Sequence, residues 1–270
     1  MPQRRASDLN VEYYVEGTGP PLLMIMGLGG QASSWGEPVL EGLQRHFTTI
    51  RFSNRGTGAT DKPADGYTVS QMADDAARLM DAIGIEKAHV FGISMGGMIA
   101  QELVLNYPDR VQGLVLGCTN CGPAHSVTIP AETLNSFGQI MSLPVEQRIQ
   151  EFWNITVTPQ FIESGAAFLN HIMELGMATP TPMETFGRQF AAIQSFDSYD
   201  RLPQIKSPTL IVQGDMDTLV PAENAEVLRE RIPGSRVRIV QGTGHCFIWE
   251  KPEEVVAEIV AFLSSVPVGA

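Results

Sequence analysis

The chain has 270 residues, of which 43% are hydrophobic and 18% charged, so it is long enough to bury a large apolar core in one domain or in a core with an inserted cap. Eighteen basic residues against thirty acidic ones give a net charge of −12, which excludes the electrostatic footprint expected of a protein that binds nucleic acid or an anionic membrane. Three cysteines, an odd number, exclude a disulfide framework and predict free thiols in a reducing compartment.

The N-terminal segment carries Arg4 and Arg5 and continues into a polar, alternating stretch at residues 9–13. It lacks the apolar region of a signal peptide. The longest apolar stretch, residues 20–26, ends in glycines and is much shorter than the roughly 20 residues that a membrane-spanning helix needs. These absences predict a cytoplasmic protein without a membrane partner.

Short apolar runs rich in Val, Ile, Leu and Phe alternate with amphipathic segments along most of the chain. This pattern is typical of parallel strands joined by crossover helices, because parallel strands are buried on both faces. The runs predict strands at residues 22–26, 48–52, 88–93, 113–116, 209–213 and 237–240. We therefore expect an α/β fold with a mostly parallel central sheet flanked by helices.

Helices are predicted between these strands. Ser70 is expected to cap a helix over residues 71–80, which Gly84 terminates. A helix over residues 98–106 follows the strand at 88–93. Pro221 is expected to begin another helix, and Pro252 opens one with an apolar face.

From about Gly122 to Asp200 the alternation of strands and helices stops and the chain becomes helical. Phenylalanine and methionine are frequent in this stretch. Such side chains form adaptable apolar walls, although in a helical insertion they are also ordinary core residues. The sequence predicts a core made of residues 1–122 and 201–270, with a helical cap at residues 123–200.

The strongest local signal is Gly92-Ile93-Ser94-Met95-Gly96-Gly97, between a predicted strand and a predicted helix. A G-x-S-x-G sequence in that context predicts a nucleophile elbow, a strained strand-to-helix turn that presents the serine. Small neighbours are needed there because side chains would collide with the flanking strand and helix. Ser94 is therefore the candidate nucleophile.

A nucleophilic serine needs a base, and an acid that orients the base. His245 follows the last predicted strand, so its imidazole is expected at the carboxyl edge of the sheet, near Ser94. Two aspartates follow the strand at 209–213. Asp217 lies farther out on the loop and is favoured as the orienting carboxylate, whereas Asp215 is expected to fix the turn by binding nearby backbone N–H groups.

The other histidines have different expected roles. His46 and His89 lie beside or within strand runs and are expected to be hydrogen-bonded structural residues. His125 and His171 fall in the predicted cap, where they could touch substrate.

Cysteine and cofactor motifs give no competing site. Cys118 and Cys121 have the spacing of half a zinc site, but no second Cys-x-x-C exists. Cys246, beside His245, has no elbow of its own and is expected to pack. No phosphate-binding or dinucleotide-binding motif is present. The sequence predicts neither a metal nor a cofactor.

The chain order Ser94, Asp217, His245, with the elbow after a central strand, resembles the α/β-hydrolase superfamily, in which the triad follows that order. The resemblance covers nearly the whole chain. It includes the arginine-glycine turn at residues 54–58, the Gly-x-x-Asp-x-x-x-Pro pattern at residues 214–221 and the position of the cap. It implies that these three residues are catalytic.

The resemblance also implies that the backbone N–H groups of Leu28 and Met95 form the oxyanion hole. Many members have His-Gly where this chain has Met26-Gly27, so Met26 replaces a histidine that usually braces this loop. The backbone donors remain in place, and the replacement changes the hydrogen bonding of the loop.

A serine at the elbow disfavours the relatives that use an aspartate nucleophile, namely haloalkane dehalogenases and epoxide hydrolases. The Ser-Met-Gly-Gly elbow is similar to those of carboxylesterases, enol-lactone hydrolases, carbon–carbon bond hydrolases and cofactor-free perhydrolases, and it does not separate them. Between Gly122 and Asp200 the only basic residues are Arg148 and Arg188, against eight Asp and Glu, which favours a neutral, largely apolar substrate.

We therefore expect a serine hydrolase that cleaves a small-molecule carboxylic ester or lactone through an acyl-enzyme. One alternative is a carbon–carbon bond hydrolase of a dienoic or β-diketone substrate, which needs the same triad. The other is a ligand-binding relative that acts as a receptor with vestigial turnover. The sequence gives no indication of the oligomeric state.

Overall fold

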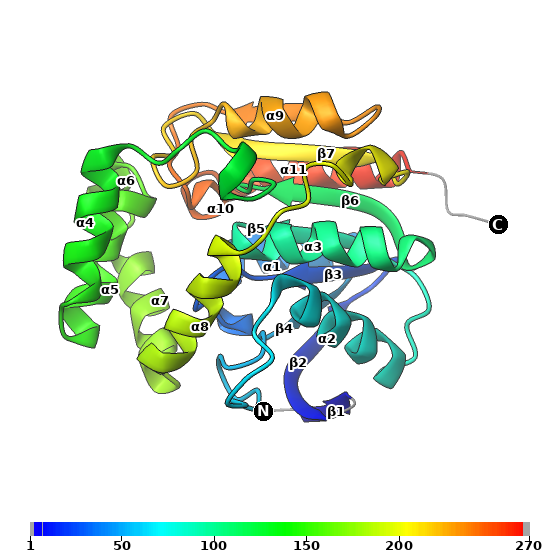
Figure 1. The fold of residues 1–270 in the computed structure, drawn as a ribbon, viewed down its shortest axis with the longest axis horizontal. Coiled ribbons are helices and arrows are strands. Elements are labelled where there is room, and N and C mark those ends of the chain that lie inside the picture. The colour runs from blue at the N-terminus through cyan, green and yellow to red at the C-terminus, as the bar shows by residue number, and fades with distance from the viewer. Residues whose placement is uncertain (1–2, 7, 267–270) are drawn as a thin grey trace.

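The computed structural model describes residues 3–6 and 8–266, and within them eight strands form one sheet in the order β1-β2-β4-β3-β5-β6-β7-β8 (Figure 1). Strands β4, β3, β5, β6, β7 and β8 run parallel, whereas β2 pairs antiparallel with β1 and β4. The strands are β1 (Gln3–Ala6), β2 (Leu9–Gly17), β3 (Pro21–Ile25), β4 (Thr48–Phe52), β5 (Ala88–Ile93), β6 (Val111–Gly117), β7 (Thr209–Gly214) and β8 (Arg236–Val240).

All six predicted strands are present, with ends within two residues of the predicted ones. The prediction of a mostly parallel α/β sheet is thereby confirmed. The antiparallel strands β1 and β2 were not predicted. Their side chains are exposed or half-buried at many positions, so they lack the continuous apolar run that marks the inner strands.

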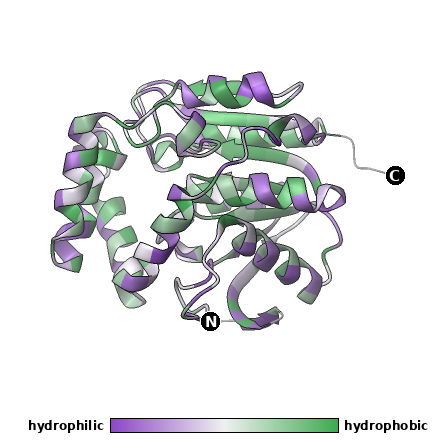
Figure 2. Ribbon diagram, viewed as in Figure 1, coloured by the Kyte–Doolittle hydropathy of each residue, from purple (hydrophilic) through white to green (hydrophobic). Residues whose placement is uncertain are grey.

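Two layers of helices cover the sheet, because successive side chains of a strand point to opposite faces. In β3, Leu23 and Ile25 pack in an apolar cluster with helices α2, α3 and α9, while Leu22 and Met24 pack in a second cluster with α1 and α11. Figure 2 shows the inner strands as hydrophobic between these layers. The helices are α1 (Glu37–Gln44), α2 (Val69–Ala82), α3 (Met95–Asn106), α9 (Asn224–Arg231), α10 (Phe247–Glu250) and α11 (Pro252–Ser264).

Three predicted helix starts are corrected. The cap of α2 is Thr68, whose hydroxyl accepts the Gln71 N–H, and not Ser70. Helix α3 begins at Met95 rather than residue 98, since the chain turns directly from the strand into the helix. Pro221 does not begin a helix, and α9 starts at Asn224 after a turn.

Five further helices lie together beside the sheet, on the side from which α3 begins (Figure 1). Phe137 of this group packs its ring against Phe152 and Phe190, with ring centroids 5.8 and 5.4 Å apart. We call these helices the cap helices; the exact division at residues 123 and 200 stays a prediction. They are α4 (Ala131–Met141), α5 (Val145–Thr156), α6 (Pro159–Ser164), α7 (Ala166–Ala178) and α8 (Met183–Gln194).

Four single-turn 3₁₀ helices complete the elements: η1 (Ala32–Trp35), η2 (Pro108–Arg110), η3 (Pro123–His125) and η4 (Leu202–Gln204). Within residues 3–6 and 8–266, none of the helices combines the length and the apolar character needed to cross a bilayer.

Candidate active site

The candidate residues lie on loops that follow neighbouring parallel strands, so they gather at the carboxyl edge of the sheet. Ser94 follows β5, residues 26–30 follow β3, and the segments with Asp217 and His245 follow β7 and β8. The Ser94 N–H donates to Gly117 O of β6 at 2.8 Å, which fixes the serine at the end of the adjacent strand. In open sheets of this kind ligands bind at this edge.

Ser94 occupies a strained backbone position between β5 and α3. Its φ of 54° and ψ of −125° lie outside the regions that side chains ordinarily adopt. A Cβ on Gly92 would lie 2.2 Å from Gly96 O, and a Cβ on Gly96 would lie 2.0 Å from Ile25 O, so both positions require glycine. This is the backbone geometry expected of a nucleophile elbow, and it presents a half-buried serine.

Two backbone segments lie beside the serine. A Cβ on Gly27 would lie 3.5 Å from Ser94 Oγ, so the loop after β3 passes directly beside the hydroxyl. The first bonds of α3 run from the Gly97 and Met98 N–H groups to Ser94 O, which leaves the Met95 N–H outside this pattern. The loop after β3 and the N-terminus of α3 therefore both lie beside Ser94, and the assignment of the Leu28 and Met95 N–H groups as oxyanion donors stays a prediction.

Asp217 and His245 form a hydrogen-bonded pair. Asp217 Oδ2 lies 2.7 Å from His245 Nδ1, and the aspartate side chain is fully buried while the imidazole keeps 11% of its surface exposed. The Leu219 and Val220 N–H groups each donate to Asp217 Oδ1 at 2.9 Å, and Gln213 Nε2 donates to Oδ2 at 2.9 Å. The carboxylate is thus fixed, and it directs the other imidazole nitrogen, Nε2, away from itself.

Among the described residues, no hydrogen bond joins Ser94 to His245, although both lie at the same edge of the sheet. Hydrogen bonds between a nucleophile and its base are often long without substrate and shorten when it binds. Asp215, by contrast, is exposed and accepts the Thr243 N–H at 3.2 Å. This contact ties the loop after β7 to the loop after β8, which is the turn-fixing role predicted for Asp215.

Hydrogen bonds from other residues hold the loop after β3, where Met26 stands. Asn54 Nδ2 donates to Met26 O at 2.8 Å, and the Met26 side chain itself is buried in the apolar core. The Gly29 N–H donates to Gln189 Oε1 at 2.9 Å, and Thr181 Oγ1 donates to Gly29 O at 3.0 Å. Sequence reasoning missed these three contributors.

The histidine loop is held from the cap side through Glu250. Its Oε1 accepts the Gly244 N–H at 2.7 Å, and its Oε2 accepts both the backbone N–H and the hydroxyl of Thr158. The Cys246 N–H donates to Thr156 O at 2.8 Å. Glu250 was not predicted either, because no local pattern links a glutamate five residues after the histidine to its role.

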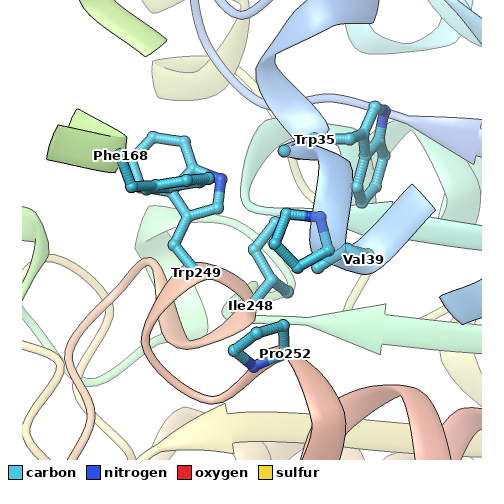
Figure 3. Close-up of a pocket in the computed structure, with 8 residues that line it drawn as sticks. Trp35, Val39, Phe168, Ile248, Trp249 and Pro252 are labelled. Carbon is cyan, nitrogen blue, oxygen red and sulfur yellow. The ribbon is translucent and has the colours of Figure 1, made fainter. Parts of the chain in front are cut away.

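A small cavity of about 10 Å³, room for about one water molecule, lies next to the histidine loop (Figure 3). The rings of Phe168 and Trp249 lie on one side of it, and Trp35 lies on the other. Trp249 Nε1 donates to Ser34 O at 3.1 Å, so this junction joins the histidine loop to both the core and the cap helices. It is far too small to hold a substrate.

The remaining histidines contribute elsewhere. His46 is exposed. His89 is buried in β5, as expected of a structural residue, but its Nδ1 has no hydrogen-bond partner among the described residues, so the expected hydrogen bond is wrong at that atom. Burial lowers the pKa of His89 to about 4. His125 stacks on Tyr199, and His171 Nε2 lies 3.5 Å from a carboxylate oxygen of Glu37.

The cysteines have no features of a nucleophile. Cys118 and Cys121 are buried and free, and burial raises the pKa of both thiols. Burial, followed by the charge of Asp217, also raises the pKa of Cys246, so that the thiol beside His245 stays protonated. Within the described ranges no group of three or more His, Cys, Asp and Glu residues has the geometry of a metal site.

Both cations of the cap helices already have partners. Arg188 donates to Glu184 Oε1 at 2.6 Å and to Pro63 O at 3.1 Å, and Arg148 donates to Leu143 O at 2.8 Å. Arg188 is thus paired with a carboxylate, whereas Arg148 binds a carbonyl oxygen and its buried Nε has no hydrogen-bond partner among the described residues.

Comparison with known proteins finds matches over most of the chain. The profile of the family described as alpha/beta hydrolase fold matches residues 20–138 and 172–252. A protein from Caulobacter sp. (strain K31) named "Putative carbamate hydrolase RutD" is 31% identical over 248 residues, 90% of each chain. A poly(3-hydroxyalkanoate) depolymerase of Ectopseudomonas oleovorans is 29% identical over 248 residues, 90% of this chain and 84% of its own. A thermophilic esterase from Thermogutta terrifontis has a similar structure, with a TM-score of 0.84, 25% identity and coverage of 98% and 99%.

Proposed function

Because the chain belongs to the α/β-hydrolase fold family, we propose that it is a serine hydrolase that cleaves a carboxylic ester or lactone through an acyl-enzyme. The observation that carries the proposal is the pairing of two features at one sheet edge. Ser94 stands on a backbone turn with φ 54°, and a buried Asp217 holds His245 at 2.7 Å. We assign Ser94, Asp217 and His245 as the catalytic residues.

In the first half of the reaction, Ser94 Oγ attacks the substrate carbonyl carbon while His245 Nε2 takes the hydroxyl proton. Asp217 keeps Nδ1 protonated and stabilises the charged imidazole. The carbonyl oxygen becomes an oxyanion that accepts hydrogen bonds from the Leu28 and Met95 N–H groups, each worth roughly 10²- to 10³-fold in turnover. The tetrahedral intermediate then expels the alkoxide, which takes the proton from His245.

Water completes the cycle. His245 takes a proton from a water molecule whose oxygen attacks the acyl carbon, and the same amides bind the second oxyanion. Collapse of this intermediate breaks the bond to Ser94 Oγ, which recovers its proton from His245. The products are a carboxylic acid and the free enzyme, so no cofactor enters the chemistry. A lactone follows the same course and gives a hydroxy acid.

The cap supports a neutral, largely apolar substrate. Its aromatic side chains pack near the histidine loop, where Phe168 contacts Trp249 with ring centroids 5.9 Å apart, and its two arginines are bound to other groups. We take residues 123–200 as the cap that forms the substrate wall. Burial of an apolar substrate body, at roughly 25 cal/mol per Å², then supplies most of the binding energy.

The named relatives favour acyl chemistry without fixing the acyl group. A carbamate, a polyhydroxyalkanoate and a simple ester all present a carbonyl carbon bonded to a leaving group, which the same serine, histidine and amides can process. Carbon–carbon bond hydrolysis of a dienoic or β-diketone substrate, and ligand binding with vestigial turnover, are the alternatives that an experiment must separate.

The test is a substrate panel assayed with the intact protein and with Ser94→Ala. The panel contains activated esters, lactones, carbamates and vinylogous diketones of matched size. We expect the highest kcat/KM for an ester or lactone, stoichiometric labelling of Ser94 by a fluorophosphonate probe, and a loss of ~10⁶-fold in turnover for Ser94→Ala. Labelling at another residue would refute the assignment, higher activity on diketones would indicate carbon–carbon hydrolysis, and binding without turnover would indicate a receptor.

A further inference from the structure

We propose that Gln189 of α8 is a positioning residue. It makes the conformation of the oxyanion loop, residues 26–30, depend on how the cap helices pack against the core. This inference rests on the proposed function, because it concerns the amides assigned to the oxyanion hole. Gln189 belongs to the cap helices, 160 residues from Gly29 in sequence, and its side chain is completely buried.

Both polar atoms of the Gln189 amide bind backbone groups of the core. Oε1 accepts the Gly29 N–H at 2.9 Å, and Nε2 donates to Arg55 O at 3.0 Å. The second contact fixes which way the amide faces, because only Nε2 can donate to a carbonyl oxygen. The Gln189 side chain therefore bridges the loop after β3 and the turn after β4, and it offers Gly29 an acceptor and never a donor.

The loop that Gln189 holds is a tight turn, and the central peptide of such a turn can in principle take two orientations. The Gly30 N–H donates to Gly27 O at 3.1 Å, so Leu28 and Gly29 are its two central residues. Gly29 has φ +69°, the value that the third residue of a type II turn requires. A type I turn has nearly the same path but its central peptide is flipped by about half a turn.

Gln189 selects between these conformations because its acceptor binds the N–H of the central Leu28–Gly29 peptide itself. Flipping that peptide would remove the N–H from Gln189 Oε1 and leave a buried acceptor unpaired, which is unfavourable. Thr181 Oγ1 binds Gly29 O at 3.0 Å and adds a second contact from the cap side. The Leu28 N–H, assigned as one oxyanion donor, belongs to the preceding Gly27–Leu28 peptide, whose oxygen accepts the turn bond from the Gly30 N–H, so loosening of the turn would also release this amide.

Packing places α8 directly on the loop. A Cβ on Gly29 would lie 3.0 Å from the Phe186 ring, and a Cβ on Gly56 would lie 2.1 Å from the Thr185 methyl group. Thr185 and Gln189 are one helical turn apart and both are buried, so one face of α8 carries the aromatic contact, the methyl contact and the amide bridge. Lifting α8 to admit substrate would break all of them together and release the loop.

The experiment compares Gln189→Leu with Arg188→Met in the full chain. Leucine keeps the volume and removes both hydrogen bonds, whereas Arg188→Met removes a different bond between the same helix and the core, that to Pro63 O. We expect Gln189→Leu to lower kcat about 10- to 100-fold with KM changed less than threefold, because the lost interaction acts on the transition state. Arg188→Met is expected to keep kcat within about twofold.

Two further measurements separate positioning from general destabilisation. Inhibition by a phenylboronic acid, whose tetrahedral adduct occupies the oxyanion site, is expected to weaken in Gln189→Leu by the same factor as kcat. Hydrogen exchange of the peptide covering residues 26–31 is expected to speed up in that variant and not in Arg188→Met.

The outcomes distinguish this inference from the proposed function. Fluorophosphonate labelling of Ser94 in the wild type together with unchanged kcat in Gln189→Leu would overturn the role of Gln189 and leave the serine mechanism standing. Failure of the wild type to react at Ser94 would overturn the proposed function itself. If Gln189→Leu does not fold, Thr181→Val provides the test, with an expected loss of about threefold in kcat, and no loss there overturns the inference.

Discussion

Asp217 and Asp215 lie two residues apart, yet only Asp217 reaches His245: its Oδ2 lies 2.7 Å from Nδ1, whereas Asp215 Oδ1 accepts the Thr243 N–H at 3.2 Å. Asp217→Asn is expected to lower kcat by ~10⁴-fold with the fold intact, because an amide can stabilise the wrong imidazole tautomer. Asp215→Asn is expected to change stability more than kcat. Steady-state kinetics at equal folded fraction check the ranking, and a larger kcat loss for Asp215→Asn would contradict it.

Glu250 is expected to matter for both stability and turnover, because it accepts N–H groups from the histidine loop and from the cap side at once. Glu250→Ala leaves these donors unpaired, and we expect a loss of about 2 to 4 kcal/mol in the free energy of unfolding. A displaced His245 would lower kcat by up to about 10²-fold. Glu253→Ala, which removes an exposed carboxylate from the next helix, is the matched control and is expected to leave kcat unchanged.

Substrates that carry a terminal carboxylate are expected to react less well than matched neutral esters. Arg188 is paired with Glu184, Arg148 binds a backbone carbonyl oxygen, and the chain has a net charge of −12, so an anion is poorly attracted. The comparison is kcat/KM for the two series. A tenfold preference for the carboxylated series that disappears in Arg148→Ala or Arg188→Ala would show that a neutral, largely apolar substrate is the wrong interpretation and would favour a dicarboxylate enol-lactone hydrolase.

Stability is expected to fall with pH below about 6.5 because of His89. Burial lowers its pKa to about 4 in the folded protein, whereas an unfolded histidine titrates near its ordinary 6.5. Between these values the unfolded chain binds more protons than the folded protein, so the free energy of unfolding rises with pH. His89 alone lowers the free energy of unfolding by about 2 kcal/mol when the pH falls from 7.5 to 5. His89→Leu is expected to remove that part of the pH dependence. Denaturant titrations at the two pH values measure it, and an unchanged slope would contradict the assignment.

The parts of the fold that depend on local pattern could be predicted from the sequence. Continuous apolar runs predicted the parallel strands. Gly84, with φ +75°, lies just beyond the end of α2, as the sequence predicted. The candidate nucleophile Ser94 was predicted from its neighbouring glycines, of which Gly92 and Gly96 are packed against backbone atoms. The preference for Asp217 over Asp215 rested on reach along the loop, and the hydrogen bonds agree with it.

The supporting residues could not be predicted, because their partners are distant in sequence. Gln189 and Gly29 are 160 residues apart, and Glu250 and Thr158 are 92 apart. Neither glutamine nor glutamate carries a periodic or turn signal at those positions, so only the docking of the cap helices on the sheet edge brings them to their partners. The sequence shows Met26 at a position where many members of the resembled superfamily have a histidine. It does not show that the Asn54 side chain donates a hydrogen bond to the Met26 carbonyl oxygen.

The backbone at residue 94 also bears on how the chain evolves. A left-handed conformation at a residue with a side chain costs on the order of 1 to 3 kcal/mol, and glycine adopts it without that cost. Mutation toward glycine at this position would therefore stabilise the fold, so selection for stability alone favours loss of the serine. A lineage that kept this scaffold only to bind a ligand would gain from the exchange. Ser94 therefore keeps a backbone strain that glycine would relieve, and the proposed role of its hydroxyl as the nucleophile gives a physical reason for keeping it.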